Sequence, residues 1–220
     1  MKIQAVLFDI DGTLVDSNEQ HVNAWAFAFR DEGHPQERDD IRAQIGKGAD
    51  MLLPALIPDV AEGVRQRIAD RHGDYFADMY LDHVRAFPRA AELVAKVHDS
   101  GRKVVLASSA GRAEVEHYVD LLGIADRLST STSIDDVESS KPAPDIFSAA
   151  LHKAGVAAEH ALVVGDTPYD VAAAQRAGLL AVGVTSGPFG QAELRDAGAI
   201  AVYADVADLL DRFDASPLAG

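Results

Sequence analysis

The strongest constraint in the sequence is a short apolar run that ends in two aspartates. Residues 3–8 are mostly apolar, and Asp9, Asp11 and Gly12 follow directly. A short apolar run that ends in a turn signal is typical of a buried strand, and a glycine lets the chain turn away there. Because ligands bind at the carboxyl ends of strands in open α/β sheets, both carboxylates stand where a site is expected. The alternative is that the two aspartates are turn residues, although a turn needs only one.

The rest of the chain divides into a helical block and an alternation of strands with helices. Residues 16–85 show helical spacing, as in Val22, Trp25, Ala26 and Phe29, and no strand pattern. Strand-like segments follow at 103–107, 128–131, 161–164, 180–184 and 200–203. Strands that alternate with helices favour a parallel sheet covered on both faces.

We therefore predict an α/β fold: a doubly wound, Rossmann-like parallel sheet formed by residues 1–15 and 86–220. Residues 16–85 are predicted to form an all-helical domain, inserted after the first strand. Ser17 and Gln20 are spaced as a helix capping box, Pro54 is expected to interrupt a helix, and residues 216–220 are expected to fray.

Composition limits the classes of partner. The chain has 220 residues, a formal net charge of −15 and no cysteine, which excludes disulfides and thiolate metal sites. An acidic chain disfavours nucleic acid as a partner. Asp9 and Asp11 interrupt the first apolar run, so we expect no signal peptide, no membrane span and a cytoplasmic location. The sequence leaves both a monomer and a homodimer open.

A second pair of aspartates follows a later strand-like run. Asp166 and Asp170 come after residues 161–164. If both strands are central, these carboxylates share a crevice with Asp9 and Asp11, where like charges about 4 Å apart repel by roughly 4 kcal/mol at an effective dielectric near 20. A cation would relieve this repulsion, and ligands that are all oxygen favour Mg²⁺. The alternatives are a turn aspartate at Asp166 and a solvated acid in the first turn of a helix at Asp170.

Three further residues are candidates for binding an anion. Ser108 and Ser109 lie between a strand-like run and a helix, where a hydroxyl group and free main-chain N–H groups can hold an anion. A simple N-cap is the alternative for both serines. Lys141 precedes Pro142, and a solvated surface lysine is its alternative.

Together these stretches resemble the haloacid dehalogenase (HAD) superfamily. Its four motifs match in order: residues 9–13, Ser108, Lys141, and Gly165-Asp166 with Asp170. The resemblance covers the whole chain, including a helical cap between the first two motifs. It implies that Asp9 is a nucleophile that forms an aspartyl-phosphate.

The resemblance assigns the other motif residues as well. It implies that Asp11 is the general acid and base, and that Asp9, the main-chain carbonyl of Asp11 and Asp166 hold Mg²⁺ with support from Asp170. Ser108 and Lys141 would hold the phosphoryl oxygens. Further substrate-binding candidates are Gly12, Thr13, His21, Lys47 and Ser109.

The resemblance also indicates which type of reaction to expect. Dehalogenases of the superfamily lack an aspartate at the position of Asp11, which favours phosphoryl transfer. The cap resembles that of the phosphoglycolate phosphatase and β-phosphoglucomutase group, and His21 matches a pattern found in both, with a helix-surface histidine as the alternative. Ala49 stands near the position at which the mutases carry an arginine. Lys47, in the same loop, is either a substrate contact or a solvated residue.

The resulting hypothesis is a Mg²⁺-dependent phosphatase acting on a small phosphorylated metabolite, a sugar phosphate or phosphoglycolate. A β-phosphoglucomutase-like phosphomutase is one alternative. A non-catalytic protein that binds a phosphorylated ligand is the other.

Overall fold

A six-stranded sheet forms the centre of the protein. The structure, a computed structural model, describes residues 2–220. The strands lie in the order β5-β4-β1-β6-β7-β8, and all neighbouring pairs are parallel. Their bounds are β1 (Ala5–Phe8), β4 (Lys103–Ala107), β5 (Leu128–Thr132), β6 (Ala161–Gly165), β7 (Leu180–Val184) and β8 (Ala201–Tyr203). This topology confirms the predicted doubly wound α/β fold.

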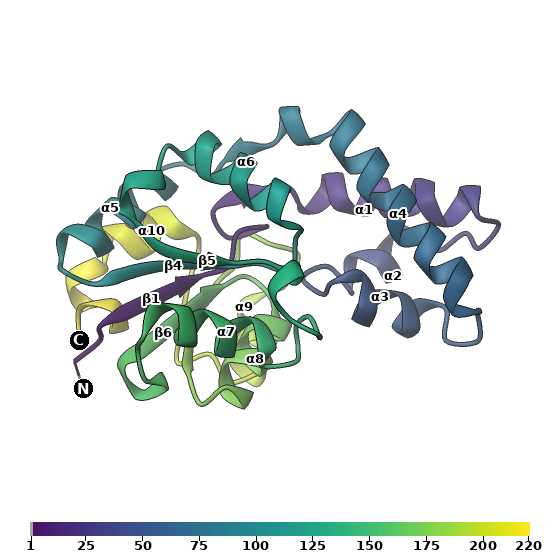
Figure 1. Ribbon diagram of the computed structural model, residues 1–220. Helices are drawn as coiled ribbons and strands as arrows, with labels where there is room; N and C mark the ends of the chain where they lie inside the picture. The colour runs from purple at the N-terminus through teal and green to yellow at the C-terminus, as the bar shows by residue number, and fades with distance from the viewer. Residues whose placement is uncertain (1) are drawn as a thin grey trace.

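Both faces of the sheet are covered by helices (Figure 1). The covering helices are α5 (Ala90–Asp99), α6 (Arg112–Leu122) and α10 (Val206–Asp211) on one face, and α7 (Asp145–Ala154), α8 (Pro168–Arg176) and α9 (Gln191–Asp196) on the other. Val6 and Phe8 of β1 belong to the first apolar layer, whereas Ala5 and Leu7 belong to the second. A strand buried on both faces needs apolar residues at every position, which explains the unbroken apolar run in the sequence.

Two of these helices, α6 and α7, are followed by a glycine at the point where the chain turns away from the helix. Gly123 after α6 and Gly155 after α7 have φ values of 65° and 62°. This left-handed conformation suits glycine, and it lets the main chain satisfy the last carbonyl groups of a helix.

Four helices form a lobe beside the sheet (Figure 1): α1 (Asn18–Asp31), α2 (Arg38–Arg42), α3 (Ala49–Leu56) and α4 (Glu62–Met79). They enclose an apolar cluster of their own that includes Val22, Phe29, Ile41, Leu52 and Ile68. A two-stranded antiparallel ribbon of β2 (Val15–Asp16) and β3 (Arg85–Ala86) joins the chain segments that enter and leave this lobe.

Two local expectations were wrong. Pro54 lies inside α3 rather than at its end; a proline removes one main-chain N–H, and the helix persists because Leu52 and Leu53 are buried beside it. The last residues do not fray, because Leu218 is fully buried and the Ile3 N–H donates to the Gly220 carbonyl at 2.9 Å. Within residues 2–220, no helix has the length and apolar character needed to cross a membrane.

Candidate active site

The strand register brings the first, second and fourth motifs to one edge of the sheet. Phe8 of β1 is paired with Leu106 of β4 and with Val164 of β6. The chain therefore leaves all three strands at the same edge, where Asp9, Ser108 and Asp166 follow. This is the edge at which a parallel sheet places its ligands.

Three carboxylates and one ammonium group lie close together at this edge of the sheet. Asp9, Asp166 and Asp170 are at most 5% exposed, and one oxygen of each lies within 4.8 Å of the others. Lys141, 1% exposed, contacts Asp9 Oδ1 and places Nζ 2.7 Å from Asp170 Oδ1. The N–H and hydroxyl groups of Thr167 donate to the other oxygen of Asp170 at 3.1 and 2.6 Å. Neither Lys141 nor Asp170 is a solvated surface residue.

When all three carboxylates are ionised, this cluster carries an excess of negative charge, and the pKa values of its members reflect the resulting repulsion and their burial. Burial raises the pKa of Asp9 to about 7 against the opposing effect of Lys141, and burial together with the charges of Asp9 and Asp170 raises the pKa of Asp166 well above its usual range. Burial acts to lower the pKa of Lys141, but the charges of Asp170 and Asp9 outweigh it and raise that pKa. One ammonium cannot neutralise three carboxylates. The cluster thus has the charge and the oxygen ligands that suit a divalent cation.

The position of Asp166 is fixed from several sides. Thr13 Oγ1 donates to its Oδ1 at 3.1 Å, and Asn18 Nδ2 donates to its Oδ2 at 3.1 Å. A Cβ atom on Gly12 would lie 2.2 Å from Asp166 Oδ2, and one on Gly187 only 1.7 Å from it. Two glycines therefore allow the main chain to approach this carboxylate. Neither Asn18 nor Gly187 was predicted from the sequence.

Asp11 lies beside the cluster and is held by the start of α1. Ser17 Oγ donates to Asp11 Oδ1 at 2.5 Å, and His21 Nε2 lies 3.3 Å from the same oxygen. The predicted capping box is wrong: the Ser17 side chain makes no cap hydrogen bond to α1, because its hydroxyl group binds Asp11. Burial acts to raise the pKa of Asp11, but the hydrogen bonds from His21 and Ser17 outweigh it and lower that pKa.

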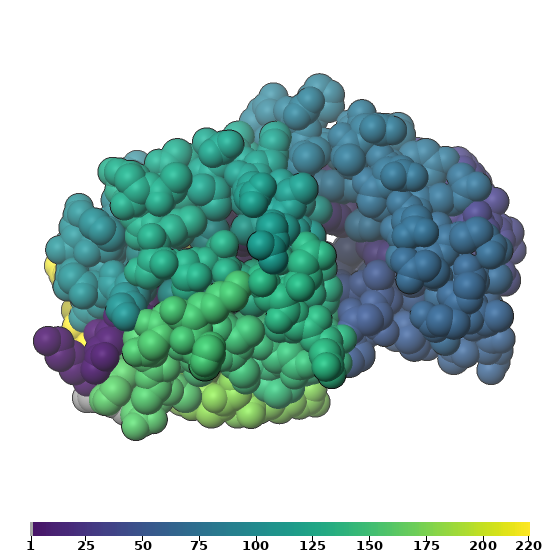
Figure 2. All heavy atoms as spheres, in the orientation of Figure 1, coloured from purple at the N-terminus to yellow at the C-terminus, as the bar shows by residue number. Residues whose placement is uncertain are grey.

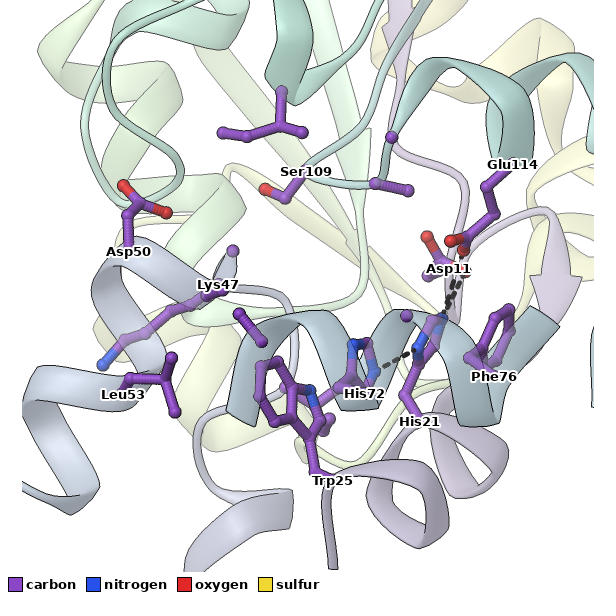
Figure 3. Close-up of a pocket in the computed structure, with 18 of the residues that line it drawn as sticks. Asp11, His21, Trp25, Lys47, Asp50, Leu53, His72, Phe76, Ser109 and Glu114 are labelled. Carbon is purple, nitrogen blue, oxygen red and sulfur yellow. Dashed lines mark hydrogen bonds and ion pairs between the residues drawn. The ribbon is translucent and has the colours of Figure 1, made fainter. Parts of the chain in front are cut away.

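His21 connects the helical lobe to the core (Figure 3). Its Nε2 lies 3.4 Å from Glu114 Oε1, its Nδ1 lies 3.2 Å from His72 Nε2, and its ring stacks on Phe76 with centres 3.8 Å apart. Burial acts to lower the pKa of His21, but the hydrogen bonds to Asp11 and Glu114 raise it to about 10. His21 is therefore more than a helix-surface residue. Glu114 and His72 carry no motif in the sequence, and their places follow only from how α4 and α6 pack.

The two serines occupy different positions. Ser108 Oγ accepts from the Ala110 N–H at 3.0 Å and donates to Asp11 Oδ2 at 3.5 Å. Ser109 Oγ donates to the Gly46 carbonyl of the helical lobe at 3.4 Å. Because α6 begins at Arg112 with Gly111 as its N-cap, the N-cap alternative for both serines is wrong.

Lys47 and Trp25 line the side of the pocket that belongs to the helical lobe. Lys47 Nζ donates to Gln44 and lies 4.4 Å from the ring centre of Tyr169, and burial lowers its pKa. Trp25 is 4% exposed and stacks on His72 with ring centres 3.9 Å apart. Lys47 reaches the pocket but lies outside the carboxylate cluster.

The pocket itself lies between the helical lobe and the core, where the space-filling view shows a hollow (Figure 2). Its volume is about 690 Å³, and Asp9 and Asp11 form part of its wall. The candidate nucleophile and the candidate acid thus face the same cavity.

Comparison with known proteins supports the assignment of the family. The family model for haloacid dehalogenase-like hydrolases matches residues 3–178. A phosphoglycolate phosphatase of Yersinia pseudotuberculosis is 31% identical over 214 residues, which cover 94% of this chain and 92% of that protein.

Two further proteins are similar to this chain. The chloroplastic protein SUPPRESSOR OF QUENCHING 1 of Arabidopsis thaliana is 33% identical over 215 residues; the match covers 94% of this chain but only 20% of that much longer relative. The crystal structure of a hydrolase from Pseudomonas syringae superposes with a TM-score of 0.91 at 32% identity, covering 96% of this chain and 98% of the other. The family suggested by the sequence is confirmed: the chain belongs to the haloacid dehalogenase-like hydrolases.

Proposed function

We propose that this protein is a Mg²⁺-dependent phosphatase that hydrolyses a small phosphorylated metabolite through an aspartyl-phosphate intermediate. The observation that carries the proposal is the buried contact of Asp9 with Lys141 beside Asp166 and Asp170. A carboxylate attacks a dianionic phosphate only where positive charge offsets the repulsion. The name of the Yersinia relative, a phosphoglycolate phosphatase, supports a phosphate monoester as substrate.

In this proposal Asp9 is the nucleophile. One of its oxygens forms a bond to phosphorus while the bond from phosphorus to the leaving oxygen breaks, which gives the aspartyl-phosphate. Lys141 holds Asp9 and a phosphoryl oxygen, and Ser108 holds another. Water then attacks phosphorus, the bond from Asp9 to phosphorus breaks and inorganic phosphate leaves.

Asp11 moves the protons in both steps. It donates a proton to the leaving oxygen in the first step and accepts one from the attacking water in the second. Ser17 and His21 bind its carboxylate, at 2.5 and 3.3 Å, and so fix its orientation. The leaving group departs as a neutral alcohol and Asp9 is regenerated.

The residues present suit Mg²⁺. Asp9, Asp166 and the main-chain carbonyl of Asp11 would hold the ion, and Asp170 would support it. The bound ion would neutralise charge on the phosphoryl oxygens. Among the residues the structure describes, this group offers only oxygen ligands, which is the preference of Mg²⁺.

We further propose that residues 16–85 act as a cap domain. The Gly48 N–H donates to Ser140 Oγ at 2.8 Å, and the Ser140 N–H donates to Asp50 Oδ2 at 2.9 Å. These bonds tie the N-terminus of α3, at Gly48 and Asp50, to the residue next to Lys141. Closure at this point excludes water from the nucleophile until the phosphoenzyme has formed.

The test is phosphate release from a panel of phosphorylated metabolites, with Mg²⁺ and with EDTA, by the wild type and by Asp9→Asn. We expect release that depends on Mg²⁺ and is lost in the variant, because an amide is a poor nucleophile. Appreciable turnover by Asp9→Asn contradicts the assignment of the nucleophile. Conversion of β-glucose 1-phosphate to glucose 6-phosphate in place of release identifies a phosphomutase, and binding without turnover identifies a binding protein.

A further inference from the structure

One nitrogen of His21 faces two carboxylates at once. Its Nε2 lies 3.3 Å from Asp11 Oδ1 and 3.4 Å from Glu114 Oε1 (Figure 3). Ionised carboxylates only accept hydrogen bonds, so a nitrogen between two of them carries the proton. Asp11 and Glu114 therefore share a single N–H donor at nearly equal distances.

The ring of His21 has little freedom to move. It stacks on Phe76 with ring centres 3.8 Å apart, and its Nδ1 lies 3.2 Å from His72 Nε2. The side chain of His21 is only 12% exposed. Because a polar group taken out of water is costly to leave without a partner, the Nε2–H group must keep one of its two carboxylates whenever it loses the other.

Glu114 is held beside His21 by its own helix. It lies in the first turn of α6, and the hydroxyl group of Tyr118, one turn later, donates to its Oε1 at 3.1 Å. Tyr118 is fully buried. In the described part of the chain, Glu114 forms no ion pair except the one with His21. Its carboxylate is therefore fixed in orientation and available to the His21 N–H.

The proposed reaction changes how strongly Asp11 attracts this N–H. Asp11 gives a proton to the leaving oxygen in the first step and takes one from the attacking water in the second. Hydrogen bonds to an ionised carboxylate are roughly twice as strong as those between neutral groups. The hold of Asp11 on the His21 N–H should therefore rise and fall once in each turnover.

We infer that Glu114 is a positioning residue that holds the His21 N–H while Asp11 is protonated. The inference rests on the proposed phosphatase function. When Asp11 loses its proton to the leaving oxygen, the N–H returns to Asp11 and stabilises the new carboxylate. When Asp11 takes the proton of the attacking water, the N–H goes back to Glu114. His21 keeps its own proton throughout, so Glu114 receives a hydrogen bond and no proton.

The first test compares two esters whose leaving groups differ in their need for a proton. p-Nitrophenyl phosphate releases a stable phenolate, whereas p-nitrobenzyl phosphate releases an alcohol that must be protonated. Phosphoenzyme formation is followed by rapid quench with enzyme in excess and Mg²⁺ present. Glu114→Gln keeps the size of the side chain and an oxygen for Tyr118 but removes the charge. It should slow the reaction of p-nitrobenzyl phosphate about tenfold, a part of the general-acid effect, and that of p-nitrophenyl phosphate less than about threefold.

Decay of the phosphoenzyme provides a second test, which does not depend on the leaving group. Asp11 is the base in this step and is a weaker one without Glu114, so Glu114→Gln should slow the decay about fivefold. In an Asp11→Asn background the same change should have almost no effect, because Glu114 acts only through Asp11. The matched control is Glu116→Gln, an exposed residue of the same helix, which should leave all of these rates at the wild-type values.

The outcomes separate this inference from the proposed function. Equal slowing of both esters by Glu114→Gln overturns the inference, because neither a structural defect nor a lost substrate contact distinguishes the two leaving groups. Wild-type rates in Glu114→Gln, a similar loss in Glu116→Gln, or a further slowing of decay above about threefold in Asp11→Asn also overturn it. In each case the phosphoenzyme still forms, and the proposed function stands. A wild type that forms no phosphoenzyme with either ester or with any metabolite of the panel contradicts the proposed function itself.

Discussion

Replacing Gly187 by alanine tests the idea that the glycines around Asp166 hold a metal-binding carboxylate in place. A Cβ atom at Gly187 would lie 1.7 Å from Asp166 Oδ2 and 2.9 Å from its Cβ. Contacts of Cβ atoms below 3.0 Å are essentially not seen, so the carboxylate and the loop at Gly187 must separate by at least 1.3 Å. The φ angle of Gly187 lies outside the left-handed range, so the added methyl group acts by contact and not by backbone strain.

The displacement should weaken both metal binding and turnover. The carboxylate cannot swing freely, because Thr13 and Asn18 hold its two oxygens at 3.1 Å each. A misplacement of about 1 Å at a catalytic group can cost on the order of 10²-fold in rate. Loss of ligand orientation costs about 10–100-fold in metal affinity. We therefore expect kcat/KM to fall about 100-fold and the dissociation constant for Mg²⁺ to rise at least about tenfold.

The assay combines steady-state phosphate release with Mg²⁺ titration by calorimetry. Gly190→Ala is the matched control, since it lies in the same loop with φ −83° and its Cβ would meet its nearest neighbour, Glu193 Oε2, at 3.5 Å. The control should behave as the wild type does. If Gly187→Ala keeps both kcat/KM and Mg²⁺ affinity within about threefold of the wild type, the reasoning about Asp166 is refuted.

Three further predictions follow from the same geometry. Asp11→Asn should accumulate the phosphoenzyme, because the attacking water lacks a base. Rapid-quench single-turnover kinetics measure this accumulation, and kinetics equal to those of the wild type would rule out Asp11 as the general acid and base. Lys141→Met should lower the free energy of unfolding in urea with EDTA by about 3–5 kcal/mol, because the buried carboxylates lose their cation; a change below about 1 kcal/mol would show that the ammonium is not needed for stability. Mg²⁺ at about 100 times its dissociation constant should stabilise the wild type by about 2.7 kcal/mol, measured as a rise in Tm, and Asp166→Asn should lose most of this rise; an equal rise in the variant places the ion elsewhere.

The strands of the core were predictable because burial on both faces leaves a local signal. The predicted runs at 103–107 and 180–184 coincide with β4 and β7, since central parallel strands are apolar at nearly every position. The ribbon of β2 and β3 was not predicted. Each of its strands has two residues, too few for a period to be recognised.

Residues of the site could be predicted from the sequence only where they directly follow a strand or match a motif of the family. Asp9 and Asp166 directly follow β1 and β6. The sequence predicted that they share a crevice if both strands are central, and the pairing of β1 with β6 meets that condition. Lys141 is 132 residues from Asp9, and only the resemblance to a family indicated that it belongs with the other motifs. Ser17 was assigned to a helix cap because its spacing suits one, whereas its hydroxyl group binds Asp11.

The alternation of strands and helices, the helical segment after the first strand and the order of the motifs could all be predicted from the amino-acid sequence, because each depends on residues close together in the chain. Only the packing of distant elements brings His72 and Glu114 to His21 and places Gly187 against Asp166. These properties arise from contacts between elements distant in sequence. The shifted pKa values of the site have the same origin, since desolvation and neighbouring charge depend on how the whole chain packs around each group.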